Sequence, residues 1–183
     1  MPYIIAGAVV LLIAVWLIIT YNRLVSEKLK VENQWSQIDI VLKQRADTVP
    51  NLVSVVSAYA QHEKDVFASV TSSREKYMNA KTPSESVAAY STLSSDIAKL
   101  MAVAENYPEL KANGNFLDLQ KQLAGLEGKL ADFRQFFNDT VMRYNNLVMI
   151  FPSSIAAKLF HFEKKDFFTV SDEEKASPRA DFR

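Results

Sequence analysis

The sequence predicts an all-α protein in which an N-terminal transmembrane helix continues into an elongated antiparallel four-helix bundle. Residues 3–19 form an unbroken apolar run, and the rest of the chain carries apolar residues at helical spacing between prolines. Four glycines and six prolines among 183 residues are too few for a turn-rich β protein. We therefore expect an anchor (1–22), a helical bundle (23–152) and a C-terminal tail (153–183) that caps the bundle or lies against the membrane.

The apolar run has the features of an uncleaved membrane anchor. Every Asp, Glu, Lys and Arg of the chain lies after Asn22. As a helix the run is about 26 Å long, which suffices for a thin hydrocarbon core. A cleaved signal peptide would need a basic segment before the run and small residues at the cleavage site, and the sequence has neither.

Basic residues next to the run predict its orientation. Arg23, Lys28 and Lys30 follow the run closely, whereas only the α-amino group precedes it. By the positive-inside rule, the short N-terminus lies outside and the rest of the chain lies in the cytoplasm. The sequence thus predicts a single-pass membrane protein.

A proline marks the expected end of the first bundle helix. Apolar residues recur at helical spacing as far as Val49, and Pro50 lacks a backbone N–H and disfavours α geometry at the residue before it. We expect the chain to reverse within residues 47–50, with Pro50 in the first turn of the second helix. Asp47 and Asn51 would then cap the helix ends at this reversal.

Local signals delimit the third and fourth helices. Residues 82–85, Thr-Pro-Ser-Glu, form a capping box that begins the third helix, which must stop before Pro108. Asn113 and Asn115 lie in the following turn, and Asn115 is expected to cap the fourth helix.

The fourth helix has the clearest apolar stripe. Its members recur every three or four residues, which is typical of a bundle core rather than of a cofactor pocket. Gly125 and Gly128 lie within it and mark either a close approach of another helix or tolerated surface positions. The stripe consists of Phe116, Leu119, Leu123, Leu126, Leu130, Phe133, Phe137, Val141, Tyr144, Val148 and Phe151.

The sequence predicts no catalysis and no cofactor or metal site. There is no cysteine, and the two histidines, His62 and His161, lack the spacing of a zinc helix or a di-metal carboxylate bundle. No glycine-rich phosphate loop or Gly-x-Ser-x-Gly motif occurs. Twenty-one basic and 21 acidic residues give zero formal net charge, which disfavours nucleic-acid binding.

Motifs along nearly the whole chain resemble the LemA family in the same order. The resemblance implies a bacterial, single-pass protein of the inner membrane, with a short outside N-terminus, a cytoplasmic helical domain and no established catalytic activity. Gln44 and Phe137 depart from the basic residue and the tyrosine that the family pattern leads us to expect. The matching segments are Tyr21–Val25, Val31–Glu32, Trp35–Asp39, Lys43–Val53, Tyr59, His62–Glu63, Tyr107–Asn113, Asn115–Phe116, Leu119–Gln120, Leu123, Glu127, Arg134, Phe137–Asn138, Tyr144–Asn145 and Phe151–Pro152.

Two of these family-like positions are candidates for partner contact. Trp35 and Arg45 are residue types that dominate protein interfaces. The alternative is structural, because polar residues at helix junctions also satisfy unpaired backbone groups at helix ends.

Aromatic and basic residues gather after the fourth helix and form a candidate membrane surface: Phe160, Phe162, Phe167, Phe168, Lys164 and Lys165. Aromatic rings favour the bilayer interface, and lysines are attracted to an anionic leaflet. The alternative is that these rings plug the open end of the bundle. The polar run 171–183 is expected to be a loose terminus.

The functional expectation is a membrane-anchored helical scaffold or adaptor that acts through protein–protein contacts. Its partners would be the lipid bilayer and an unidentified membrane or cytoplasmic protein, or further copies of the same chain. The alternative is a regulatory subunit of a membrane enzyme such as an envelope protease.

Overall fold

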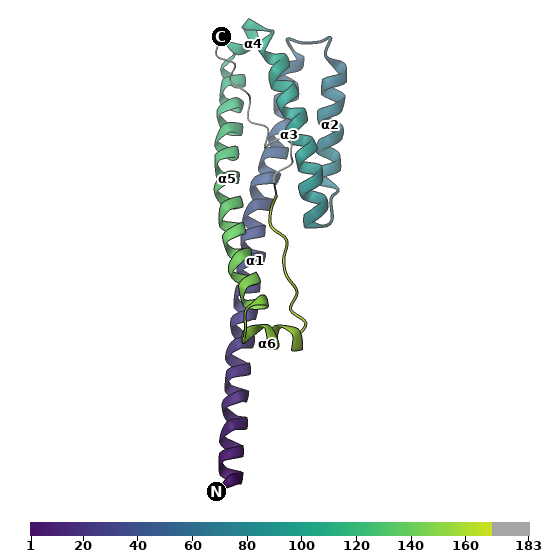
Figure 1. The fold of residues 1–183 in the computed structure, drawn as a ribbon. Helices are drawn as coiled ribbons and strands as arrows, with labels where there is room; N and C mark the ends of the chain where they lie inside the picture. Colours follow the sequence, from purple (N-terminus) through teal and green to yellow (C-terminus); the bar gives the residue numbers. More distant parts are fainter. Residues whose placement is uncertain (170–183) are drawn as a thin grey trace, which may run out of the picture. The chain divides into compact units, whose positions relative to one another are not determined.

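The computed structural model describes residues 1–169, and within them it contains six helices and no strand (Figure 1). This confirms the all-α class, with a long N-terminal apolar helix and helices consistent with a bundle. The helices are α1 (Pro2–Ser57), α2 (Lys64–Met78), α3 (Pro83–Glu105), α4 (Pro108–Lys111), α5 (Gly114–Met149) and α6 (Ser153–Leu159). The described residues form two compact units, 1–37 with 132–169 and 38–131, and α1 and α5 contribute to both.

The N-terminal part of α1 exposes its apolar side chains. Tyr3 is 90% exposed, Ile4 73% and Ile19 61%. In the part of the chain that the structure describes, α1 alone is long and apolar enough to cross a membrane. A regular helix satisfies its own backbone hydrogen bonds, as a membrane-spanning segment must.

The predicted reversal at residues 47–50 is wrong, because α1 continues through Pro50 to Ser57. An internal proline costs a helix about 3 kcal/mol. Leu52 and Val56, however, extend the apolar stripe beyond Pro50 and are fully buried. Their burial favours the continued helix. Asp47 and Asn51 are therefore exposed positions inside α1 and cap no helix end.

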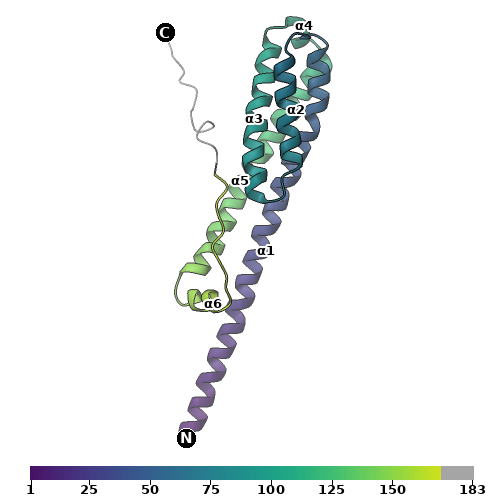
Figure 2. The same ribbon diagram turned by 90° about the vertical axis from the view of Figure 1, so that its right-hand side faces the viewer.

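The unit of residues 38–131 is built from helical segments around one apolar core. Its segments are the C-terminal part of α1, α2, α3, α4 and the N-terminal part of α5, and α2 packs along α3 (Figure 2). The buried apolar residues include Ile38, Val41, Leu42, Ala46, Val49, Leu52, Val56, Ala60, Val70, Tyr77, Tyr90, Leu93, Ile97, Leu100, Ala104, Leu110, Phe116, Leu123 and Leu130.

The helix caps agree with the sequence at α3 and differ at α5. Thr82 accepts a hydrogen bond from the amide of Glu85 at 3.2 Å, as the capping box predicts. The carboxylate of Glu85 accepts one from the amide of Lys81 at 2.9 Å. At α5 the capping side chain is Asn113, whose Oδ1 accepts from the amide of Phe116 at 3.2 Å, and not the predicted Asn115. The helix begins two residues earlier than expected, at Gly114 rather than Phe116, which places Asn113 at the capping position.

The other unit joins the first part of α1 to the last part of α5, with α6 and the non-helical residues 162–169 packed on this pair. Leu24 of α1 and Ala156 and Ala157 of α6 are all fully buried in one cluster. Trp16 and Phe162 are partly buried against that cluster.

Candidate membrane-proximal site

Helix α6 follows a tight turn at the end of α5. The hydroxyl of Ser153 and the amide of Ser154 both donate to the carbonyl oxygen of Ile150, at 2.8 and 2.9 Å. This arrangement satisfies a carbonyl that the end of α5 leaves free. Because Ala156 and Ala157 are small, α6 can press its buried face closely against Leu24 of α1.

The opposite face of α6 and the preceding turn expose large apolar side chains. Phe151 is 76% exposed, Leu159 58% and Ile155 53%. Phe151 also lines a cavity with Trp16 of α1, so this surface adjoins the end of the apolar run. We call the exposed side chains of Ile150, Phe151, Ile155, Leu159 and Phe160 the apolar collar.

The predicted membrane-surface residues divide into three groups. Phe160 and Phe162 pack edge-on against Tyr21 of α1, with ring centroids 4.9 and 5.8 Å apart. Phe167 is 49% exposed, and Lys164 and Lys165 are exposed as well. Phe168, in contrast, is buried at 7% exposure, so its ring does not belong to a lipid-facing surface. The run 171–183 lies outside the described residues.

Residues 163–168 form an extended strap that two asparagines of α5 hold in place. Asn145 donates from Nδ2 to the carbonyl of Lys165 at 2.8 Å and accepts from the amide of Lys165 at 2.9 Å. Asn138 makes the same pair of bonds with Phe168, at 3.1 and 2.8 Å. Each carboxamide thus bonds to both the N–H and the C=O of one strap residue, as a neighbouring β-strand would. These backbone groups would otherwise lack a partner, because the strap is not part of a sheet.

Tyr144 supplies a third attachment for the strap. Its hydroxyl donates to the carbonyl of Glu163 at 2.8 Å, and the residue is only 1% exposed. Burial raises the pKa of Tyr144, and the nearby carboxylate of Glu163 adds to this effect. The hydroxyl therefore remains a hydrogen-bond donor at neutral pH.

Trp35 forms part of the surface on which the strap packs. Its ring centroid lies 5.9 Å from that of Phe137 and 6.3 Å from that of Phe168. The guanidinium of Arg134 lies over the ring of Phe168, 4.7 Å from its centroid. Trp35 is half-buried, and in this structure it packs against the chain itself.

Arg45 lies apart from this site, in the unit of residues 38–131, and is buried at 8% exposure. Its guanidinium donates to the hydroxyl of Tyr90 and pairs with the carboxylate of Glu127. In the same core, burial raises the pKa of Tyr77 well above its ordinary value, and the neighbouring Asp39 adds to this effect. Arg45 therefore links α1, α3 and α5 internally and is not a surface anchor.

Asn138 and Asn145 lie in segments that resemble the LemA family, but neither was selected from the sequence as a site residue. The signal was their spacing of seven, which places both on one face of a helix, next to stripe members Phe137 and Tyr144. Among the described residues, no group of three or more His, Cys, Asp or Glu side chains is arranged to hold a metal ion.

Comparison with known proteins gives two likenesses. The model of the LemA family matches residues 34–182. Magnetosome protein MamQ of Magnetospirillum gryphiswaldense is 21% identical over an alignment of 178 residues, and the alignment covers 83% of this chain. The aligned region spans 65% of the length of MamQ.

Proposed function

This chain belongs to the LemA family, and we propose that it is a membrane-anchored helical scaffold or adaptor that acts through protein–protein contacts. Family membership and the N-terminal apolar helix indicate a membrane-associated helical protein. The finer role, a scaffold without catalysis, is our proposal.

The observation that carries this proposal is the continuity of α1. The helix exposes most of its apolar side chains up to Ile19 and then buries Thr20, Leu24 and Val31, with no intervening loop. The anchor therefore passes directly into the helix pair of its own unit. A continuous helix positions the packed helices relative to the bilayer more firmly than a flexible linker would.

The proposed location is the inner membrane of a bacterium, with the short N-terminus outside. Arg23, Lys28 and Lys30 support a cytoplasmic position for the chain after the anchor. The packing roles of Trp35 and Arg45 support a helical framework rather than a reactive constellation.

Purification of the full chain from its own membranes in mild detergent tests the adaptor role. An unrelated single-pass protein with the same affinity tag serves as the control. We expect one or a few proteins, or further copies of the chain, to co-elute in constant ratio after crosslinking and to be missing from the control. Elution as an uncrosslinked monomer under all conditions would contradict the adaptor role, and constant co-elution of a membrane protease would favour the regulatory-subunit alternative.

A further inference from the structure

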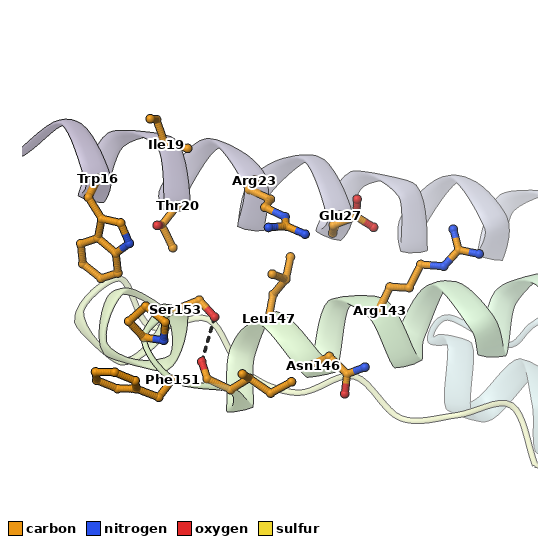
Figure 3. Close-up of a pocket in the computed structure, with 12 residues that line it drawn as sticks. Trp16, Ile19, Thr20, Arg23, Glu27, Arg143, Asn146, Leu147, Phe151 and Ser153 are labelled. Carbon is orange, nitrogen blue, oxygen red and sulfur yellow. Dashed lines mark hydrogen bonds between the residues drawn. The ribbon is translucent and has the colours of Figure 1, made fainter.

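A cavity of about 640 Å³ lies in the unit that contains the anchor, between α1, α5 and the turn before α6 (Figure 3). Its lining changes character along α1. Trp16 and Ile19, together with Phe151 from the turn, form the end nearest the apolar run, and Arg23 and Arg143 follow further along. The cavity thus has an apolar end toward the membrane-spanning segment and a basic end away from it.

Two guanidinium groups give the basic end its charge. Arg23 reaches from α1 into the space between the helices, and Arg143 reaches from α5 toward α1 (Figure 3). Within residues 1–169, neither makes an ion pair. The acidic residue in the lining, Glu27, is already engaged by Lys30 at 2.6 Å. Two guanidinium groups therefore line a cavity whose one carboxylate, that of Glu27, is already paired with Lys30.

The height of the cavity fits a lipid headgroup. If residues 3–19 span the hydrocarbon core, then Thr20, which is buried in the lining, and Arg23, one turn later, lie at the level of the headgroups. Guanidinium groups bind phosphate oxygens through paired, charge-assisted hydrogen bonds. Basic pockets beside transmembrane helices are suited to anionic lipid headgroups.

We propose that this cavity binds one anionic phospholipid from the bilayer, with the phosphate bound by the guanidinium groups of Arg23 and Arg143 and an acyl chain along Trp16 and Phe151. The inference rests on the proposed membrane anchoring. It adds a lipid class to that function: phospholipids with net negative charge bind here in preference to zwitterionic ones.

Native mass spectrometry of the full chain tests the site. The protein is purified in neutral detergent that contains equal amounts of phosphatidylglycerol and phosphatidylcholine. We expect one phosphatidylglycerol to be retained preferentially, and Arg23→Gln/Arg143→Gln to lower that retention by about tenfold or more. Lys28→Gln/Lys43→Gln removes the same charge from one partly exposed and one exposed position outside the cavity and should leave retention unchanged.

Two further measurements distinguish loss of the binding site from loss of positive charge in general and from misfolding. Arg23→Lys/Arg143→Lys keeps both charges and should restore the preference for phosphatidylglycerol, and circular dichroism should show every variant to be folded. Three results would each overturn the proposal. They are equal retention of both lipids, a loss of phosphatidylglycerol in Lys28→Gln/Lys43→Gln as large as in Arg23→Gln/Arg143→Gln, and displacement of the lipid by millimolar inorganic phosphate. Carbonate extraction of membranes tests the anchor separately: extraction of the chain would contradict anchoring itself, whereas a retained chain without lipid preference would contradict the cavity alone.

Discussion

Nε of Arg74 donates a hydrogen bond to the carbonyl oxygen of Ala46, over a distance of 2.8 Å. In a regular helix this carbonyl would accept from the amide of residue 50, but Pro50 has no N–H. The guanidinium also lies 3.6 Å from the carboxylate of Asp47. Arg74 of α2 thus replaces the donor that α1 lacks, and this helps α1 to continue through a proline.

The first prediction is a coupling between Arg74 and Pro50. Arg74→Ala leaves the carbonyl of Ala46 unpaired and should lower the free energy of unfolding by about 1–3 kcal/mol. In a Pro50→Ala background the amide of residue 50 is restored, so the same substitution should cost clearly less. Urea unfolding of the full chain in neutral detergent, followed by helical circular dichroism, measures both losses.

Asp47→Asn is the control for this cycle. It removes the ion pair but leaves the hydrogen bond to Ala46, and should cost only about 0–1 kcal/mol because Asp47 is half-exposed. Equal losses for Arg74→Ala in both backgrounds would show that Arg74 does not substitute for the proline amide.

The predicted reversal at residues 47–50 shows why part of the fold could not be predicted from the sequence. The apolar stripe continues through Leu52 and Val56, so periodicity alone favoured a longer helix. We nevertheless predicted a helix end at Pro50, because proline usually ends a helix. The donor that compensates for its missing N–H is Arg74 of α2, which is distant in sequence. Where the signal is local, as in the capping box at Thr82 or the stop before Pro108, the prediction was confirmed.

The second prediction concerns the two glycines of α5. A Cβ atom added at Gly125 or Gly128 would meet nothing within 4 Å apart from its chain neighbours and the backbone of its own helix, so these are surface positions and not points of close helix approach. Alanine loses less backbone entropy than glycine on forming a helix. Gly125→Ala and Gly128→Ala should therefore each raise the free energy of unfolding by about 0.5–1 kcal/mol. A decrease measured by urea unfolding would reveal a neighbour at these positions.

The third prediction is a pH dependence that Asp96 introduces into the α2–α3 pair. Burial alone would raise the pKa of this carboxyl, but hydrogen bonds with Lys99 and with the hydroxyls of Ser69 and Ser73 outweigh it and hold the pKa below its usual value. Because the pKa is lower in the folded state, the ionised carboxylate stabilises the fold above the unfolded value of about 3.9. That stabilisation is lost as the pH falls through the folded pKa.

Asp96→Asn should therefore destabilise the protein by about 1–2 kcal/mol at neutral pH. The difference from the parent should shrink below about pH 4, where the parent also loses its charge. Urea unfolding at a series of pH values measures the difference. If the difference in the free energy of unfolding stays constant from neutral to acidic pH, the effect of the substitution comes from packing and not from the charge of Asp96.

The strap shows why the candidate site was only partly predictable. The aromatic residues after α5 were recognised from the sequence. Whether each ring is buried or exposed, however, depends on partners that are distant in sequence. Phe168 is buried because Asn138 pairs with its backbone and Trp35 packs against its ring. Phe160, eight residues earlier, remains partly exposed beside Tyr21. Composition alone cannot separate these two rings.

The fourth prediction is residue-specific protection of the strap. The amide of Lys165 donates to Asn145, and the amide of Phe168 donates to Asn138. Asn145→Ala should accelerate hydrogen exchange most at Lys165, and Asn138→Ala most at Phe168, because each removes one acceptor. Exchange measured by NMR or by mass spectrometry with fragmentation resolves the two amides.

Asn146→Ala is the matched control on the same helix. The Asn146 side chain is exposed and makes no hydrogen bond within the described residues 1–169, so its loss should leave both amides protected. If either strap amide exchanges equally fast in the parent and in its matching variant, the asparagine pairing does not hold the strap.

The last prediction places the apolar collar in the headgroup layer. Leu159 and Phe136 are similarly exposed, at 58% and 55%, but Leu159 lies on α6 and Phe136 lies on α5, 13 residues before its end. That separation corresponds to about 20 Å of helix.

Because the chain has no cysteine, Leu159→Cys or Phe136→Cys carries a fluorescent label at a single position. In vesicles with a quencher attached to the lipid headgroup, we expect strong quenching at residue 159 and little at residue 136, since the collar adjoins Tyr21 at the end of the apolar run. Equal quenching at the two positions would remove the collar from the membrane surface and leave it available to a protein partner.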